Sequence, residues 1–357
     1  MQNRKDARKE ARKQARLRKL WKRGTIHHIV LSVITGLVLL LGGVLVGLGM
    51  VFLGPSQHVS DLAAQAMDES SAAKFVPRIF LGEDGMQQVY ARNTIQEIDM
   101  DVDTTLIDMS AANEAEAEDT PDIEIVEVTG GTYKGYMMIV KDPSRVIVGT
   151  CANAFSKDKP GKLLPDIVEH YGGIGGINAG GFWDNGGQGN GGLPIGLVIS
   201  QGKLMNNAYD NAAYNTVIGF DQNDVLIVKK MGTDAAVNRG LRDAVAFGPG
   251  LIINGEPATI TGTSSGVNPR SAIGQRADGA VLLLVIDGRQ PGSVGATYAD
   301  LIDIMMDFGA VNAANLDGGS SSTMWYEGRQ LNVGVVLTGG RELPTAFVVL
   351  DKEETEE

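Results

Sequence analysis

A single long apolar run near the N-terminus dominates the hydrophobic pattern of the chain. Residues 24–60 contain no Asp, Glu, Lys or Arg, and residues 29–53 are almost all Val, Leu, Ile and Gly. A helix that crosses ~30 Å of hydrocarbon needs ~20 such residues. The run therefore predicts one transmembrane helix over residues 24–54.

A cleaved signal peptide is the alternative interpretation of this run. The apolar core of a signal peptide is usually ~7 to 15 residues and ends at a small-x-small site. This run is longer, and Phe52-Leu53-Gly54-Pro55 is a poor cleavage site. Residues 1–23 hold eleven Lys and Arg against two acidic residues. By the positive-inside rule we expect an uncleaved signal anchor in the cell membrane, with residues 1–23 cytoplasmic and the residues after about 55 extracellular.

After the apolar run the pattern becomes mixed and then strongly polar. Residues 55–121 end in the acidic stretch 111–121, which holds small residues and no aromatic side chain. Such a composition cannot bury a core and is typical of a solvated linker. We expect residues 55–121 to form an extracytoplasmic stem that holds the body away from the bilayer.

Residues 122–352 change to short β-branched runs that are bounded by Gly, Asn, Asp or Pro, the pattern of β-strands. The runs cover residues 123–128, 136–140, 146–148, 196–199, 217–220, 225–228, 251–253, 280–286 and 347–350. Helical spacing is rare. One helix is expected over residues 163–171, and another begins at Thr297, where Asp300 completes a capping box and Gly309 ends the helix.

This pattern predicts an α+β fold, a strand-rich mixed sheet with a few covering helices, preceded by one transmembrane helix. The body holds 38 of the 47 glycines, so turns and close backbone approaches are frequent. A doubly wound nucleotide-binding fold fits poorly because the strands do not alternate with long helices.

Charge and cysteine content exclude several classes of function. The net charge of −12 divides into +9 for residues 1–23 and −21 for the remainder, so the body would be repelled by nucleic acid. Cys151 is the single cysteine, which excludes an intramolecular disulfide and a Cys-based zinc site. No nucleic-acid partner is expected, and the sequence leaves the oligomeric state open.

Four glycine-containing segments carry the polar side chains that could perform chemistry, and each follows a strand-like run. They are residues 175–184, 266–274, 282–289 and 313–322. Loops that leave a rigid scaffold are where binding and catalytic groups concentrate. Two carboxylates, two arginines and several amides therefore indicate a site for an anionic substrate.

The physical roles of these residues follow from their chemistry. Asp287 and Asp317 are the expected catalytic pair, one assisting the leaving oxygen and one activating water or stabilising an oxocarbenium ion. Arg270 and Arg289 offer fork-shaped bonds to phosphate. The expected contacts to sugar hydroxyls are Asn178, Asp184 and Asn315, and the expected backbone nest for phosphate includes Gly318, Gly319, Ser320 and Ser321.

At these segments the sequence resembles the phosphodiester glycosidase family over residues 145–350. The motifs, in order, are Asn178-Ala-Gly-Gly-Phe182, Pro194-Ile-Gly196, Phe247-Gly-Pro-Gly250, Asn268-Pro-Arg270-Ser-Ala-Ile-Gly274, Asp287-Gly-Arg289, Asn315-Leu-Asp317-Gly-Gly319-Ser-Ser321 and Gly340-Arg341. The resemblance implies hydrolysis of a sugar from a phosphodiester at a site built by Asn178, Arg270, Asp287, Arg289, Asn315 and Asp317. Ser320 departs from the family motif, which has a third glycine there.

The leading hypothesis is a membrane-anchored hydrolase that acts on sugar phosphodiesters of envelope glycopolymers or exopolysaccharide and needs no cofactor. Two alternatives remain open. One is a non-catalytic module that binds anionic cell-wall polymers. The other is a metal-dependent phosphodiesterase in which Asp184, Asp287 and Asp317 surround Ca²⁺ or Mg²⁺.

Overall fold

The computed structural model describes residues 2–70, 72–110, 121–184, 189–207, 216–334 and 340–352. The chain divides into two compact units, Met1–Gln57 and His58–Glu357. Most of the expected acidic linker, residues 111–120, lies outside the described residues.

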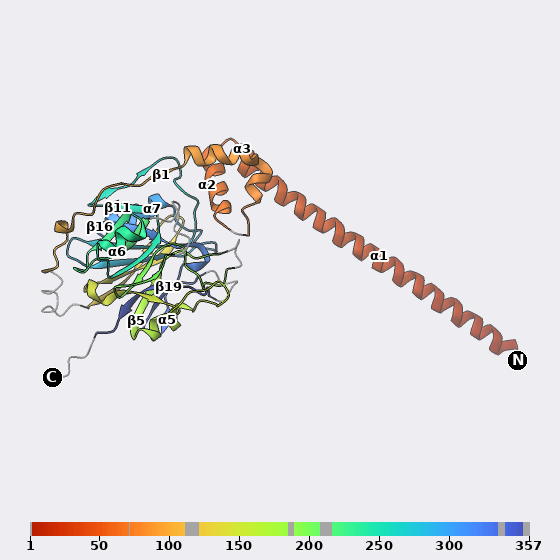
Figure 1. Cartoon of the computed structure of the whole chain (residues 1–357). Helices are drawn as coiled ribbons and strands as arrows, with labels where there is room; N and C mark the ends of the chain where they lie inside the picture. The colour runs from red at the N-terminus through yellow and green to blue at the C-terminus, as the bar shows by residue number, and fades with distance from the viewer. Residues whose placement is uncertain are drawn as a thin grey trace. The chain divides into compact units, whose positions relative to one another are not determined.

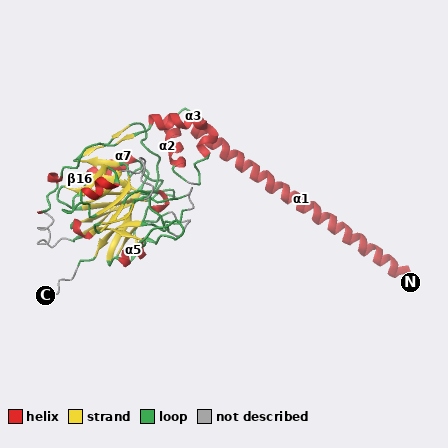
Figure 2. Ribbon diagram, viewed as in Figure 1, coloured by secondary structure: helices red, strands yellow, loops and turns green. Residues whose placement is uncertain are grey.

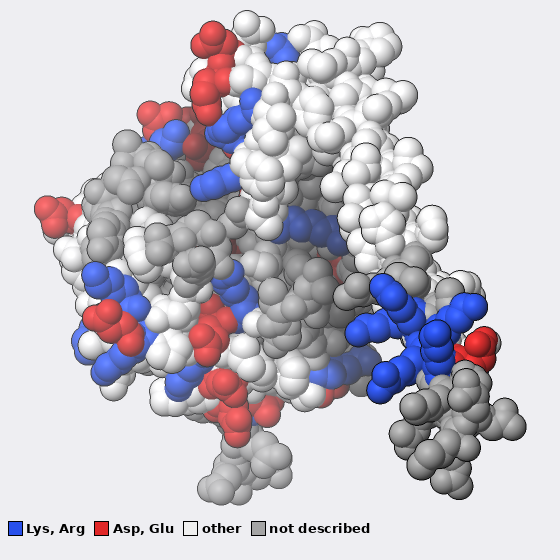
Figure 3. All heavy atoms as spheres, turned by 90° about the vertical axis from the view of Figure 1, so that its right-hand side faces the viewer, with Lys and Arg blue, Asp and Glu red and all other residues white. Residues whose placement is uncertain are grey.

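The first unit is a single long helix, α1 (Gln2–Leu53), drawn in red in Figure 1. Its segment Thr25–Leu53 has a mean hydropathy of 2.8 and is long and apolar enough to cross a membrane. Large apolar side chains such as Leu39 and Leu40 are exposed along it. Lys and Arg side chains gather toward one end, and the remaining helix surface is uncharged (Figure 3). The expected apolar helix is therefore present, with the length and position of an anchor or a signal sequence.

The second unit is the predicted α+β body, and its strands dominate Figure 2. All strand pairs among the described residues are antiparallel. The largest sheet has the order β12 (Glu256–Pro257), β11 (Gly250–Ile253), β16 (Ala310–Leu316), β14 (Arg270–Arg276), β15 (Val281–Ile286), β3 (Lys134–Val140) and β2 (Ile123–Thr129).

Two five-stranded sheets complete the main scaffold. The first has the order β7 (Lys203–Asn206), β6 (Val198–Ser200), β10 (Asp243–Phe247), β8 (Thr216–Phe220) and β9 (Leu226–Lys230). The second has the order β18 (Arg329–Gln330), β17 (Met324–Tyr326), β5 (Gly173–Asn178), β19 (Thr345–Leu350) and β4 (Val146–Thr150). All nine predicted strands are present, but they are shared among three sheets instead of forming one.

The burial of β15 explains why its sequence is an unbroken apolar run. Leu283 and Val285 enter the main core, which also contains residues of both five-stranded sheets such as Phe220 and Phe347. Leu282 and Leu284 point to the other face, where they pack with helix α7 (Tyr298–Asp307). Successive side chains of a strand alternate between faces, so a strand covered on both faces is apolar throughout.

The two predicted helices have the expected termini. Helix α7 begins after Thr297, whose hydroxyl accepts from the backbone of Asp300 while the Asp300 carboxylate accepts from Thr297 in return. Helix α5 (Leu164–His170) packs Ile167 and Val168 on the second five-stranded sheet. The described residues also contain the short helix α6 (Thr233–Asn238) and the 3-10 turns η1 (Thr104–Leu106), η3 (Pro143–Arg145) and η5 (Gly319–Ser321).

The segment expected as a spacer stem belongs to the second unit. It forms α2 (Gln57–Asp68), α3 (Val76–Arg92) and β1 (Ile95–Gln96), and β1 pairs with β13 (Thr259–Ile260). The side chain of Asn93 donates to Asp61 and accepts from the backbone of Thr263 at 2.7 Å. These buried polar bonds fix the helices on the body, so this part of the chain is not a free spacer.

We expect Phe347→Ala to lower the free energy of unfolding by about 3 to 5 kcal/mol, because it removes a fully buried ring from the main core. The ring packs edge-to-face on Phe220, with 6.3 Å between the centroids. Urea unfolding followed by tryptophan fluorescence measures the change. Val333→Ala, at an exposed position, serves as the control and should shift stability by about 0.5 kcal/mol or less. Equal effects of the two substitutions would contradict this placement of the core.

Candidate active site

The strand register brings three of the four glycine-containing segments to one end of the seven-stranded sheet. Strand β14 lies between β15 and β16, with Arg270 opposite Ile286 and Ser271 opposite Leu316. The start of β14 and the ends of its two neighbours therefore lie at the same end of the sheet, because antiparallel partners run in opposite directions. Two adjoining pockets lie there, with volumes of about 150 Å³ and 310 Å³, and both are lined by Asp317, Gly318 and Gly319.

Asp317 follows β16 directly and carries the carboxylate that both pockets share. Burial raises the pKa of Asp317 to about 6. The hydrogen bond from the Ser321 hydroxyl and the charge of Arg341 lower this pKa, whereas the charge of Asp184 raises it. A carboxyl group in this range exchanges a proton near neutral pH, which is the property that general acid–base catalysis requires.

Asn178 lies behind the pocket and holds the Asp317 loop from the second five-stranded sheet. Its Nδ2 atom donates to the carbonyl of Asp317 at 2.5 Å. Its Oδ1 atom accepts from the hydroxyl of Ser271 at 2.7 Å and from the backbone of Thr323 at 3.1 Å. The Asn178 side chain is fully buried, so its described contacts position the loop that carries Asp317.

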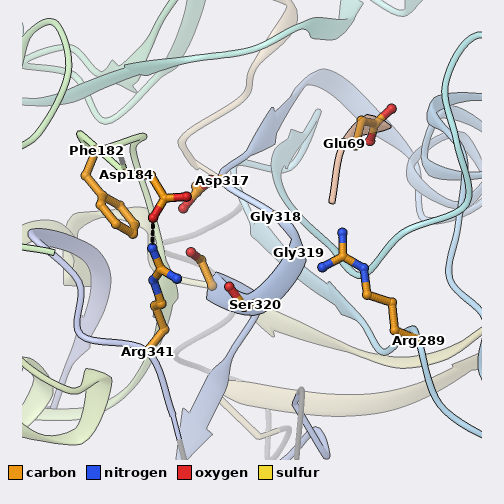
Figure 4. A pocket seen from close by; sticks show the side chains of 10 residues that line it. Glu69, Phe182, Asp184, Arg289, Asp317, Gly318, Gly319, Ser320 and Arg341 are labelled. Carbon is orange, nitrogen blue, oxygen red and sulfur yellow. Dashed lines mark hydrogen bonds and ion pairs between the residues drawn. The ribbon is translucent and has the colours of Figure 1, made fainter. Parts of the chain in front are cut away.

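The smaller pocket has an ion pair and an aromatic wall on one side. The carboxylate of Asp184 pairs with the guanidinium of Arg341, as the dashed line in Figure 4 shows. The same guanidinium stacks over the ring of Phe182, 5.0 Å from its centroid. Ser320 and Ser321 also line this pocket. A carboxylate paired with an arginine, beside an apolar ring, is suited to contact a sugar.

The larger pocket contains two arginines together with the carboxylates of Glu69 and Asp317. Arg270 is buried, donates to the carbonyls of Gly266 and Ala296, and lies 4.5 Å from the ring centroid of Tyr298. Arg289 donates to Oδ1 of Asn268 at 2.9 Å, and burial lowers the pKa of Arg289. Arg270 is buried and Arg289 is exposed as a whole residue, and both guanidinium groups line the pocket, so together they can bind an anion.

The pocket residue Glu69 lies just after α2, outside the glycine-containing segments. Figure 4 shows Glu69 and Arg289 on one side of the Gly318 and Gly319 loop, with Asp184 and Arg341 on the other. Glu69 forms an ion pair with Arg270 at 2.8 Å. No sequence motif pointed to this residue, which is separated from Arg270 by two hundred positions.

The structure brings most of the predicted site residues together. Nine of them line one or both pockets: Asp184, Arg270, Arg289, Asn315, Asp317, Gly318, Gly319, Ser320 and Ser321. Phe182, Asn268 and Arg341 also line the pockets, although the sequence reasoning gave them no role. Their presence in the ordered motifs was the signal that could have found them.

Two predicted residues line neither pocket. One is Asn178, which holds the Asp317 loop and does not face the pockets as a sugar contact would. The other is Asp287. Its buried carboxylate accepts from Nδ2 of Asn332 at 3.1 Å and from the backbone of Val333 and Gly334 at 3.1 and 3.2 Å. These contacts hold the loop after β18. The expected pairing of Asp287 with Asp317 at one pocket is therefore not what the geometry shows, and the carboxylate beside Asp317 is Asp184.

The expected backbone nest is also different from the prediction. The N–H groups of Asp317, Gly319 and Ser321 donate to the carbonyls of Ala179, Pro269 and Gly318. These three donors are therefore occupied by the protein itself and do not face an anion together. Gly319 keeps a glycine requirement, because its φ of 64° is in the left-handed region and the Arg289 guanidinium lies beside it.

No group of three His, Cys, Asp or Glu side chains is placed to hold one metal ion within the part of the chain that the structure describes. Asp184 pairs with Arg341, and Asp287 faces the loop after β18. The three aspartates of the metal-dependent alternative thus do not converge.

The family model for phosphodiester glycosidase matches residues 171–350. The chain belongs to the phosphodiester glycosidase family. The match spans the segments that form both pockets except the Glu69 region. It begins somewhat later than the resemblance expected from the motifs, which started near residue 145.

One bacterial protein is similar to part of this chain. The uncharacterized SPbeta prophage-derived protein YomE of Bacillus subtilis is 33% identical over 165 residues, which is 44% of this chain and 24% of YomE. The chain thus matches only about a quarter of that relative's length.

A solved structure supports the fold. The catalytic domain of zebrafish N-acetylglucosamine-1-phosphodiester alpha-N-acetylglucosaminidase, auto-inhibited by its pro-peptide, matches with a TM-score of 0.52 and 21% identity. The match covers 66% of this chain and 85% of that domain.

Proposed function

We propose that this protein is a membrane-anchored hydrolase that removes a sugar from a sugar-1-phosphodiester in envelope glycopolymers or exopolysaccharide. Family membership supports the reaction class. The observation that carries the proposal is Asp317, a carboxyl group with a pKa raised to about 6 by burial. It lies at the junction of a pocket that contains two arginines and a pocket that contains an Asp–Arg pair and an aromatic ring. This arrangement matches a substrate that has a phosphate on one side of the reacting bond and a sugar on the other.

The proposed chemistry breaks the bond between the sugar carbon and the phosphate oxygen. The leaving phosphate is already anionic, and arginine donors stabilise it, so the leaving group needs little protonation. The attacking water must instead lose a proton. Asp317 accepts that proton, because its raised pKa makes it a stronger base than an ordinary carboxylate. Asp184, held beside Arg341, stabilises the positive charge that develops on the sugar.

We assign recognition of a sugar hydroxyl to Asn315, whose side chain has an unused hydrogen-bond acceptor. The Nδ2 atom of Asn315 donates to the carbonyl of Gly248 at 2.8 Å. Its buried Oδ1 atom has no hydrogen-bond partner among the described residues. A buried acceptor without a donor is unfavourable, and a sugar hydroxyl would satisfy it.

The proposed location is the outer face of the cell membrane. The support is the apolar segment Thr25–Leu53 and the basic residues that precede it. Glu69, which lines both pockets, lies sixteen residues after Leu53.

The test is to incubate the full chain in detergent micelles with a panel of sugar-1-phosphodiesters. The proposal expects free reducing sugar and a phosphate monoester as products. Glu83→Gln, at an exposed residue of α3, serves as a control that should keep wild-type turnover. Retention of glycopolymer without release of sugar from any member of the panel would contradict the proposed hydrolysis and favour the binding module.

The rate of sugar release should depend on the protonation of Asp317. Because Asp317 acts as a base, it must be deprotonated, so kcat should fall about tenfold for each pH unit below its pKa of about 6 and level off above it. A pH–rate profile between pH 4 and pH 8, with roughly constant ionic strength, measures this limb. A rate that instead declines as pH rises above 6 would show that Asp317 acts as the proton donor.

A further inference from the structure

The carboxylate of Glu69 is held by a set of converging donors. The backbone N–H of Gly266 donates to Oε1 at 3.1 Å. The Nδ2 atom of Asn268 and the Nη2 atom of Arg270 both donate to Oε2 at 2.8 Å. Arg289 adds a nearby positive charge, since it interacts electrostatically with Glu69.

This donor set is built to bind an anion. Arg270 is buried, and Glu69 is the carboxylate that pairs with its guanidinium. Asn268 is also buried, and its side chain contacts both Glu69 and Arg289. An amide, a backbone N–H and a guanidinium that converge on two oxygens match a phosphodiester anion as well as they match a carboxylate.

Glu69 itself is the less fixed partner. Its side chain is 33% exposed, compared with 6% for Arg270. The residue follows the last residue of α2 and lines both pockets, so space lies beside its carboxylate. Rotation of the Glu69 side chain would leave the buried donors in place and open to a ligand.

We propose that Gly266, Asn268, Arg270 and Arg289 form the subsite for the phosphate group of the substrate, and that Glu69 occupies this subsite until the substrate displaces it. This inference rests on the proposed function, because a phosphodiester substrate brings the anion that replaces Glu69. Glu69 therefore lowers the apparent affinity for phosphodiesters, since only molecules with the carboxylate displaced are competent to bind.

The test uses dimethyl phosphate, the smallest phosphodiester, and isothermal titration calorimetry on the full chain in detergent micelles. We expect Glu69→Gln to bind dimethyl phosphate about tenfold more tightly than the wild-type chain, because the competing negative charge is gone. Glu83→Gln, which changes a glutamate that pairs with Arg78 away from the pockets, should bind as the wild type does. Unchanged or weaker binding by Glu69→Gln would overturn the proposal.

Two further measurements test whether the phosphate group binds at Asn268 and Arg270. In the Glu69→Gln background, Asn268→Ala should weaken dimethyl phosphate binding about fivefold to tenfold, because it removes one donor. A structure of the wild-type chain with dimethyl phosphate needs no variant. We expect the phosphate oxygens to contact Arg270 and Asn268, with the Glu69 carboxylate moved away. Phosphate bound elsewhere, with Glu69 still on Arg270, would contradict the assignment.

Binding and turnover separate the two proposals. Tighter binding of dimethyl phosphate by Glu69→Gln, without hydrolysis of any sugar phosphodiester, would support the subsite and reject the proposed reaction. Sugar release with no effect of Glu69 on binding would do the reverse. Acetate is the comparison ligand, and acetate binding tighter than dimethyl phosphate would overturn the phosphodiester assignment.

Discussion

Replacement of Asp317 by Asn should lower kcat for sugar release by about 10² to 10⁴-fold, the range for loss of a general acid–base group. The amide has nearly the same shape as the carboxylate but cannot accept a proton from water. KM should change much less than kcat, because the arginines that bind the phosphate remain. Steady-state kinetics on a sugar-1-phosphodiester measures both constants.

The same substitution should stabilise the folded protein above pH 6. Burial raises the pKa of Asp317 from 3.8 to about 6, so the folded state binds the proton more tightly than the unfolded state. The stabilisation that goes with protonated Asp317 is fully present below pH 3.8 and is lost as pH rises through about 6. Asn is neutral throughout, and we expect Asp317→Asn to be about 1 to 2 kcal/mol more stable than the wild type at pH 8.

Urea unfolding at pH 5 and pH 8 measures this difference. The amide loses one acceptor for the Ser321 hydroxyl, which affects both pH values alike. The stability advantage of Asp317→Asn should therefore increase from pH 5 to pH 8. A variant that keeps full activity, or one whose stability relative to the wild type is the same at both pH values, would remove Asp317 from the centre of the mechanism.

Replacement of Asp287 by Ala should lower the free energy of unfolding by about 3 to 5 kcal/mol, a size that is typical for breaking a buried charged hydrogen-bond network. The buried carboxylate accepts bonds from Asn332, Val333 and Gly334, and its loss leaves these donors without their acceptor. Activity should fall in proportion to the loss of folded protein. Thermal unfolding and the kinetics of the folded fraction measure the two effects.

Asp303→Ala is a matched control for this prediction, because Asp303 lies exposed on α7. The control should change stability by about 0.5 kcal/mol or less. A result in which Asp287→Ala is as stable as the wild type but has no activity would contradict the structural role. It would restore the catalytic role that the sequence predicted for Asp287.

The hydrophobic pattern predicted the strands that have continuous apolar runs, because buried strands are rich in apolar residues. The run at β15 is apolar at every position, since both faces of that strand are covered. Strands with few large apolar residues were not predicted. β5 contains three glycines, and β16 contains two asparagines and three alanines, so neither resembles a typical strand. Their identity depends on partners far away in the sequence.

The pairing of Asp287 with Asp317 shows the limit of sequence reasoning about the site. Both residues directly follow strands that terminate at the same end of the sheet, so the sequence gives no reason to separate their roles. Strand β14 lies between β15 and β16, which separates those strand ends by about 10 Å at ~4.8 Å per strand. Asp287 turns to a loop near residue 333, a contact that no local motif encodes.

The partners of two pocket residues could not be read from local pattern, although Arg341 stands in one of the ordered motifs. Arg341 reaches Asp184 across 157 positions, and Glu69 reaches Arg270 across 201. Their roles arise from tertiary packing. By contrast, Arg270, Arg289 and Asn315 were predictable, because each is a polar residue beside a glycine or at the start or end of an apolar strand.

The most direct test of the central claim is hydrolysis of a sugar-1-phosphodiester in water enriched in ¹⁸O. Attack on the sugar carbon places the new oxygen in the sugar, so the released phosphate monoester should carry no ¹⁸O by phosphorus NMR. Attack on phosphorus places the label in the phosphate. An unlabelled phosphate product is the result we predict, and a labelled one would show that the enzyme is a phosphodiesterase.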